Sequence, residues 1–221
     1  MKDSVIVAEH SAGGRIVGQL TLNAEKTLNS LTREMVDVIT NQLESWGNDD
    51  RVVAVFIDGS GDRAFCAGGD VLALRNSCLK SPGGPCEYAE NFFAREYRMN
   101  YILHTFKKPL ICWGHGVVVV CGLGIPAGCG HRVVSERTRI GMPEITIALF
   151  PDVGGSWFLN RMADQIGRFL ALTSSHINAT DALFCGLGTH FLAHEQKVEV
   201  QEALIGMNWD DDLECNQRLI N

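Results

Sequence analysis

The chain has 221 residues, enough for one large domain or for one domain with a small appendage. Its hydrophobic content of 46% and charged content of 20% are those of a globular protein with a substantial core. The net charge of −7 argues against nucleic-acid binding, because no basic stripe is present to neutralise phosphates. No window approaches the ~20 apolar residues that cross a bilayer, so we expect no membrane insertion.

The eight cysteines form no metal-binding pattern. They include no CxxC pair and no Cys/His spacing of the kind that binds zinc. Several, such as Cys112 and Cys185, lie in apolar runs, where cysteine behaves as a small hydrophobic residue. The N-terminal sequence MKDSVIVAEH has no secretory apolar region. We therefore predict no metal site and a reduced, cytoplasmic setting.

The first part of the chain alternates between strand and helix patterns. β-branched residues flank a Ser-Ala-Gly-Gly turn at 11–14, which predicts a hairpin. Ser30 and Thr32 are candidate caps for the amphipathic helix that follows. The apolar run at 52–59, closed by a glycine, predicts a buried strand, and a loop then leads to a short helix near 71–77.

The alternation continues to the end of the chain. Residues 78–87 are rich in proline and glycine and predict a flexible segment, and the stretch that follows, to 106, predicts a helix. A further buried strand is predicted at 108–116, and two short strands are predicted at 132–136 and 139–142. From Pro151 onward the pattern is helical, with one break at GLGTHFL. This alternation predicts an α/β fold with a helical tail.

Two glycine-rich passages are candidate sites. FCAGGD, at 65–70, ends in an acid that begins a helix. Gly68 and Gly69 can adopt backbone angles closed to other residues, and so bring N–H groups against a ligand oxygen as half of an oxyanion hole. VCGLGIPAGCG, at 120–130, matches neither GxGxxG nor a phosphate loop. Each passage also has a simpler interpretation: a turn for the first, and close helix–strand packing for the second.

Two carboxylates lie eight residues apart in the apolar stretch 142–155. Glu144 follows a proline at the start of a predicted helix, where capping is the simpler interpretation. Asp152 precedes Val-Gly-Gly and is able to close a turn. Because a buried charge is expensive unless it is paired or used, the two acids could instead divide acid–base work in one pocket. The chain has no GxSxG motif for a serine hydrolase, and His115 is interpreted as structural.

Together, and in this order, these motifs resemble the enoyl-CoA hydratase/isomerase (crotonase) superfamily from about residue 4 to residue 190. RAFCAGGDV, FFAREYRMNYILHTFKKPLICWGHG and MPEITIALFPDVGGSWFLNRM are most similar to the 3-hydroxyisobutyryl-CoA hydrolase branch, which pairs a Glu in MPE with an Asp in FPDVGG. The resemblance implies an α/β, crotonase-like spiral of repeated ββα units, assembled as a homo-oligomer (trimer or hexamer). It implies an acyl-CoA-binding core at 1–190 and the start of a shortened, incomplete helical C-terminal region at 191–221.

The resemblance also implies a site. The backbone N–H groups of Gly69 and Cys121 would hold the thioester carbonyl oxygen. Glu144 would attack the thioester or activate water, and Asp152 would position water or the leaving group. Glu96, which by itself is an ordinary solvated helix acid, would face the acyl hydroxyl. The other residues expected at the substrate are Gly68, Asp70, Gly122 and, near the CoA nucleotide, Lys26. No metal and no cofactor are implied, since coenzyme A is part of the substrate.

The implied function is hydrolysis of a short branched β-hydroxyacyl-CoA, such as 3-hydroxyisobutyryl-CoA in valine catabolism, to the free acid and CoA. An enoyl-CoA hydratase or isomerase, and a catalytically weak acyl-CoA-binding homologue, stay open as alternatives. Gly124 stands where hydratases of the superfamily carry another glutamate, which argues against simple hydration. Val119-Val120-Cys121 replaces glycines of the branch, so a positive φ at Cys121 would be strained.

Overall fold

The structure, a computed structural model, describes residues 3–210 and 212–220. The first two residues of the predicted core at 1–190, and residues 211 and 221 of the predicted C-terminal region at 191–221, lie outside the described residues. Strands β1 (Val5–Ala12) and β2 (Arg15–Leu22) pair antiparallel, as the hairpin prediction requires. Both turn glycines have positive φ, which glycine adopts at no steric cost. The helix predicted next is α1 (Arg33–Gly47), and the Thr32 hydroxyl caps it by accepting from the Met35 N–H.

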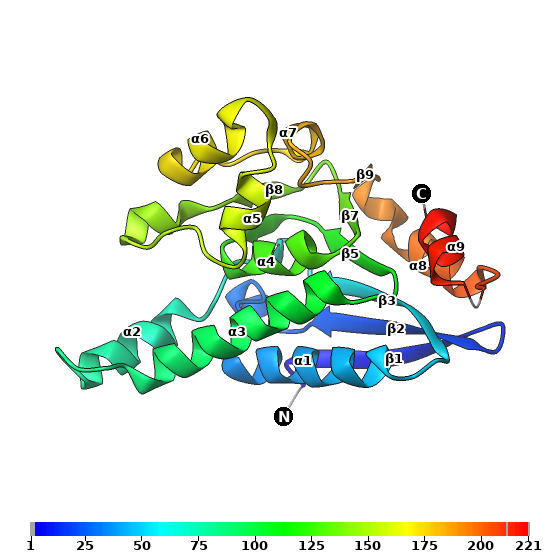
Figure 1. The fold of residues 1–221 in the computed structure, drawn as a ribbon, viewed down its shortest axis with the longest axis horizontal. Helices are drawn as coiled ribbons and strands as arrows, with labels where there is room; N and C mark the ends of the chain where they lie inside the picture. Colours follow the sequence, from blue (N-terminus) through cyan, green and yellow to red (C-terminus); the bar gives the residue numbers. More distant parts are fainter. Residues whose placement is uncertain (1–2, 211, 221) are drawn as a thin grey trace.

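Two sheets run through the molecule (Figure 1). The six-stranded sheet has the order β1-β2-β3-β5-β7-β9, and the three-stranded sheet has the order β4-β6-β8. Only the β1–β2 pair is antiparallel; every other pair is parallel. The remaining strands are β3 (Val52–Gly59), β4 (Ala64–Cys66), β5 (Leu110–Gly114), β6 (Val117–Val119), β7 (His131–Val134), β8 (Arg139–Gly141) and β9 (His190–Phe191). Successive strand pairs β3/β4, β5/β6 and β7/β8 each place one strand in each sheet, which is the predicted spiral of ββα units.

The helices surround the sheets, and α5, α6 and α7 form the upper part of the molecule in Figure 1. They are α2 (Val71–Lys80), α3 (Glu87–Thr105), α4 (Cys121–Gly128), α5 (Gly155–Leu159), α6 (Ile166–Thr173), α7 (Ala179–Phe184), α8 (Lys197–Gly206) and α9 (Leu213–Leu219), with 3-10 turns η1 (Glu25–Thr27), η2 (Pro143–Ile147), η3 (Ala163–Gln165) and η4 (His194–Gln196). The flexible segment was predicted to begin at residue 78. In the structure α2 continues to Lys80, so the chain leaves the helical conformation only after that residue. Within the described ranges, no helix is both long and apolar enough to cross a membrane.

Strand β3 shows how the core is divided between the two faces of the large sheet. All its residues are buried, and successive side chains of a strand point to opposite faces. Val55 and Ile57 join the main core together with residues of α1 and α3. Ala54 and Phe56 join a second, smaller core that includes Leu204 of α8. The large sheet is therefore packed on both faces, which explains why β3 is a continuous apolar run rather than an alternating one.

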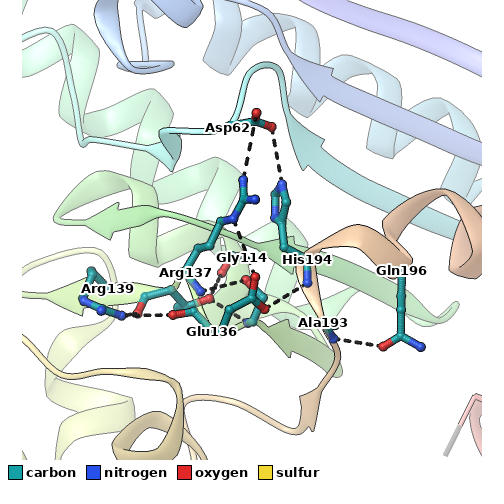
Figure 2. Close-up of polar contacts among 10 residues, drawn as sticks. Asp62, Gly114, Glu136, Arg137, Arg139, Ala193, His194 and Gln196 are labelled. Carbon is teal, nitrogen blue, oxygen red and sulfur yellow. Dashed lines mark hydrogen bonds and ion pairs between the residues drawn. The ribbon is translucent and has the colours of Figure 1, made fainter.

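The chain after β9 is fastened to two loops of the spiral. Figure 2 shows Arg137, in the β7–β8 turn, and His194 both pointing at Asp62 of the β3–β4 loop, at 3.9 and 3.4 Å. The Glu136 carboxylate accepts the backbone N–H of His194 at 3.0 Å. His115, interpreted from the sequence as structural, is buried, and its Nε2 lies 2.8 Å from the Gly61 carbonyl oxygen in the same loop.

Candidate active site

The FCAGGD loop is held against the segment before α1. Its residues Ala67 and Asp70 donate backbone N–H groups to the carbonyls of Leu28 and Leu31, at 3.0 and 2.9 Å. Gly68 has a φ of +103°, a conformation that favours glycine. The Asp70 carboxylate accepts from the Ala73 N–H at 2.9 Å, so it caps α2. The loop therefore ends with a fixed turn that leaves Gly69 facing the N-terminus of α4.

The passage from β6 into α4 places the backbone strain one residue earlier than the sequence suggested. Val120 has φ 52° and ψ −126°, a region that β-branched residues almost never occupy. Cys121 is the first residue of the helix and has no positive φ. The strain that a positive φ would cause at Cys121 is therefore absent, because the chain completes its reversal at Val120 before the helix begins.

The two amides that the resemblance singled out lie close together. A Cβ built on Gly69 would lie 3.1 Å from the Cys121 Sγ, so the two residues are in contact. Among the loop and turn hydrogen bonds of the described chain, none uses the Gly69 or the Cys121 N–H as donor. Two unused N–H donors on adjacent loops are what an oxyanion hole needs.

Three buried carboxylates form a chain of neighbours that starts at Cys121: Glu96 and Asp152 lie near its thiol, and Glu144 lies near Asp152. Glu96 and Glu144 are fully buried and Asp152 is 5% exposed. Both carboxylate oxygens of Glu96 and of Glu144, and Oδ1 of Asp152, have no hydrogen-bond partner of good geometry among the described residues. The interpretation of Glu96 as a solvated helix acid is wrong, since it lies on the inner face of α3. Glu144, in the first turn of η2, caps nothing with its side chain, and a side-chain cap was the simpler sequence interpretation.

Burial and mutual repulsion alter the acidity of these groups. Burial raises the pKa of Glu144 to about 7, and the nearby Asp152 charge adds to the rise. Burial also raises the pKa of Glu96 to about 7, an effect that the adjacent Cys121 thiol partly offsets. The pKa of Asp152 is raised by burial and lowered in part by its hydrogen bond from Tyr97. Carboxyl groups that titrate near neutrality can give and take protons there.

Two residues of α3 complete this group, and no sequence pattern singled them out. The Tyr97 hydroxyl donates to Oδ2 of Asp152 at 2.8 Å, which leaves Oδ1 as the unpartnered oxygen. Asn100, one helical turn after Glu96, has both polar atoms of its side-chain amide buried without a partner among the described residues. The spacing Glu96–Asn100 on one helix face was the available indication, but it is common on solvated helices.

The cysteine at 121 gives the site an unusual lining. Cys121 is 3% exposed, and its thiol lies between Gly69 and Glu96. Burial and the charge of Glu96 raise the pKa of this thiol well above its ordinary value. The thiol is therefore protonated at neutral pH, and a protonated thiol is a poor nucleophile.

The remaining predicted site residues have other surroundings. A Cβ on Gly122 would lie 2.3 Å from the Cys66 carbonyl oxygen, so this glycine allows α4 to pack on β4. Lys26 is exposed on η1, in the segment that contacts the FCAGGD loop. A cavity of about 250 Å³ opens beside the site and is lined by Tyr97, Asn100 and residues of α4 and α5. In the described ranges, no group of three or more His, Cys, Asp or Glu side chains could hold a metal ion.

Comparison with known proteins identifies the class to which this fold and site belong. The sequence model of the enoyl-CoA hydratase/isomerase family matches residues 17–221, and the chain belongs to that family. Among solved structures, the chain is similar to a carnitinyl-CoA dehydratase from Mycobacterium thermoresistibile, with a TM-score of 0.86 and 35% identity over 99% of this chain and 60% of that one. The crotonase fold expected from the motifs is confirmed.

Curated relatives narrow the comparison. The chain is 37% identical to the mitochondrial 3-hydroxyisobutyryl-CoA hydrolase of Gallus gallus over 190 residues, which are 86% of this chain and 48% of that protein. It is also 34% identical to the small ribosomal subunit protein mS47 of Neurospora crassa, over 90% of this chain and 39% of that protein. The chain thus spans about half the length, or less, of the curated relatives it matches. The similarity to the hydrolase branch that the motifs indicated is confirmed.

Proposed function

We propose that the chain hydrolyses a short branched β-hydroxyacyl-CoA thioester, of the 3-hydroxyisobutyryl-CoA kind, to the free acid and CoA. The observation that carries the proposal is the burial of Glu144 near Asp152, together with the closeness of Asp152 to Cys121, whose N–H group, like that of Gly69, is free. The hydrolase named among the relatives supports it. A pair of acids suits hydrolysis better than proton shuttling alone, because hydrolysis needs both an activated oxygen and a protonated leaving group.

In this mechanism the two amides bind the thioester carbonyl oxygen and stabilise the negative charge that develops on it. Glu144, with a pKa raised by burial to about 7, is ionised in an appreciable fraction of molecules at neutral pH and either attacks the carbonyl carbon or takes a proton from water. Asp152, held by Tyr97, orients the water or protonates the departing thiolate. The Glu96 carboxylate accepts a hydrogen bond from the hydroxyl of the acyl group, which would supply the partner that its oxygens lack.

Two assays with one protein test this proposal. The protein is incubated with 3-hydroxyisobutyryl-CoA and with crotonyl-CoA, and free thiol release and loss of the enoyl chromophore are followed. We expect thiol release from the first substrate, falling by about 10²-fold or more in Glu144→Gln, the usual scale for a lost acid–base group. Loss of chromophore without thiol release would instead establish the hydratase or isomerase alternative.

A second candidate, a catalytically weak acyl-CoA-binding homologue, is favoured by the Cys121 thiol. It lies next to Gly69 and beside Glu96, in space that glycine would leave open. The similarity to a protein whose name describes a ribosomal subunit rather than a reaction also favours this candidate. Binding of either CoA ester, with neither thiol release nor chromophore loss, would establish this candidate.

We also propose, from the sequence and the family resemblance, a homo-oligomer (trimer or hexamer), a cytoplasmic setting and no cofactor beyond the CoA of the substrate. Light scattering on the purified protein tests the oligomer. Cell fractionation tests the compartment, with the mitochondrial matrix as the contrary outcome because that location stands in the relatives' names. Activity of dialysed, chelator-treated protein tests the absence of a cofactor.

A further inference from the structure

The hairpin formed by α2 and α3 carries two cysteines whose thiols are neighbours. This hairpin projects from the body of the molecule (Figure 1). Cys78 lies in the last turn of α2, and Cys86 is the N-cap of α3. The short connection between the helices, SPGGP, turns the chain back on itself with hydrogen bonds from Ser81 to Cys78 and from Gly84 to Ser81. The Cys86 Sγ lies 3.2 Å from the Ser77 Oγ. Cys78 directly follows Ser77, and the thiols of Cys78 and Cys86 are close enough to alter each other's pKa.

We propose that Cys78 and Cys86 are a redox-active pair that closes into a reversible disulfide when a peroxide oxidises the protein. Three observations support the proposal: the two thiols are neighbours across the hairpin, with the Cys86 Sγ 3.2 Å from the residue before Cys78, both residues are accessible, and both thiols are free. The elements that carry them pack against each other, so no rearrangement of the core is required. Nothing in the proposed thioester chemistry uses either residue, so the inference does not depend on it.

The surroundings of the two thiols differ in a way that assigns their roles. The hydrogen bond from Ser77, followed by the backbone N–H groups of Ala89 and Tyr88 at the start of α3, lowers the pKa of Cys86. Two acids in the same helical turn, Glu87 and Glu90, oppose this effect. The neighbouring Cys86 thiol raises the pKa of Cys78. Because Cys86 also lies at the N-terminus of α3 with the Ser77 hydroxyl 3.2 Å from its sulfur, it is assigned as the attacking thiolate and Cys78 as the resolving thiol.

The chemistry balances with hydrogen peroxide as the oxidant. The Cys86 thiolate attacks one peroxide oxygen, which forms Cys86 sulfenic acid and releases hydroxide. The Cys78 sulfur then attacks the sulfenic sulfur, a sulfur–sulfur bond forms, and water leaves. Two thiols are oxidised and one peroxide is reduced to two waters, counting the proton that the hydroxide takes up. A dithiol reductant reverses the step by thiol–disulfide exchange.

The disulfide would act on a weakly held element. Helix α2 has no buried residue, and it begins directly after Gly69 and its cap Asp70. Joining its last turn to the start of α3 therefore restrains the element that follows the candidate oxyanion-hole loop. A cross-link that closes a short loop restricts the unfolded chain, so the oxidised protein should melt at a higher temperature than the reduced one.

The chain contains a matched control for proximity. The thiols of Cys112 and Cys129 are also neighbours, but both residues are buried, and burial raises the pKa of Cys112 well above its ordinary value. If proximity alone were sufficient, this pair would oxidise as well. Because the thiolate reacts and the thiol does not, we expect the buried pair to stay reduced under conditions that oxidise Cys78 and Cys86.

The test is peroxide treatment of the reduced full chain, followed by alkylation and mass spectrometry. We expect loss of two alkylation sites, a cross-linked peptide that joins positions 78 and 86, reversal by dithiothreitol and a raised melting temperature. Cys78→Ser should leave a sulfenic acid at Cys86 that dimedone traps, and Cys86→Ser should leave Cys78 reduced. The proposal is overturned if both residues stay alkylated while other cysteines oxidise, or if Cys86 over-oxidises with Cys78 still free. These measurements do not depend on thioester hydrolysis, so a failure of this proposal can be distinguished from a failure of the proposed function.

Discussion

At the scale of single residues, the site concentrates features that cost stability. Three buried carboxylates lie with five of their six oxygens unpartnered among the described residues. Val120 has a backbone conformation that its β-branched side chain disfavours. Strain and unsatisfied polar groups of this kind persist only where the surrounding structure holds them in place, and they concentrate at functional sites. This supports the candidate site independently of the family resemblance.

The buried acids make stability depend on pH. Because the pKa of Glu144 is about 7 in the folded protein, above its ordinary 4.5, the folded protein binds more protons than the unfolded chain between these values. The stability that protonated Glu144 contributes is therefore present in full below pH 4.5 and is lost as the pH rises through 7. The loss in the free energy of unfolding amounts to up to ~3 kcal/mol. We expect Glu144→Gln to be more stable than the parent by about 1–3 kcal/mol at pH 8 and similar to it at pH 5. Urea unfolding at both pH values measures this.

The control for this prediction is Glu34→Gln, a change of an exposed acid on α1. Its stability relative to the parent should be nearly the same at both pH values. An equal loss of stability for Glu144→Gln at pH 5 and pH 8 would contradict the prediction, because it would mean that the buried charge costs nothing.

The strain at Val120 predicts a stabilising substitution. Glycine adopts a φ of 52° and a ψ of −126° freely, so Val120→Gly removes backbone strain of about 1–3 kcal/mol. Part of this gain is lost to the greater freedom of glycine in the unfolded chain, about 1 kcal/mol. We expect a net gain of about 1 kcal/mol in thermal unfolding, whereas Val119→Gly, in the buried strand β6, should be destabilising. Similar losses for both variants would show that Val120 is not strained.

At the scale of elements, the sequence predicted the strands and helices better than the contacts between them. The hairpin, β3, α3 and the glycine-rich turns follow from periodicity and local chemistry. The burial of Glu96 does not, because one face of α3 is covered by α4 only in the folded chain. The site likewise joins segments that are far apart in sequence, which local patterns cannot indicate. Family resemblance supplied Glu96, whereas Tyr97 and Asn100 needed coordinates.

The approach of α4 to β4 predicts an intolerance at Gly122. A Cβ there would lie 2.3 Å from the Cys66 carbonyl oxygen and 2.8 Å from its Cβ, and neither atom belongs to a flexible side-chain end. We expect Gly122→Ala to cost about 1–3 kcal/mol or more, because α4 must move away from the strand. Gly206→Ala, in α8 with open space around its Cβ, is the matched control and should be neutral or slightly stabilising. Chemical denaturation of both variants decides whether this contact is as tight as described.

At the scale of the whole molecule, the last thirty residues are joined to the spiral. Lys197 forms an ion pair with the buried Asp58 of β3, and the contacts of His194 with Asp62 and Glu136 fasten the chain just before it (Figure 2). Leu204 packs with Phe56 in the second core. The proposed boundary near residue 190 thus marks a change in pattern along the sequence, while the two parts share apolar contacts.

These shared contacts predict that the two parts unfold together. Leu204 is 4% exposed and contributes to the core on the outer face of the large sheet, so Leu204→Ala should lower the free energy of unfolding by about 2–4 kcal/mol. Leu219→Ala, at a position that is 43% exposed, should cost little. Urea unfolding followed by tryptophan fluorescence, with limited proteolysis in parallel, measures both. Cooperative folding requires the loss of stability to spread to the strands. If Leu204→Ala only increased cleavage after residue 191 and left the stability of the sheet unchanged, residues 191–221 would be a separate unit that docks on the core.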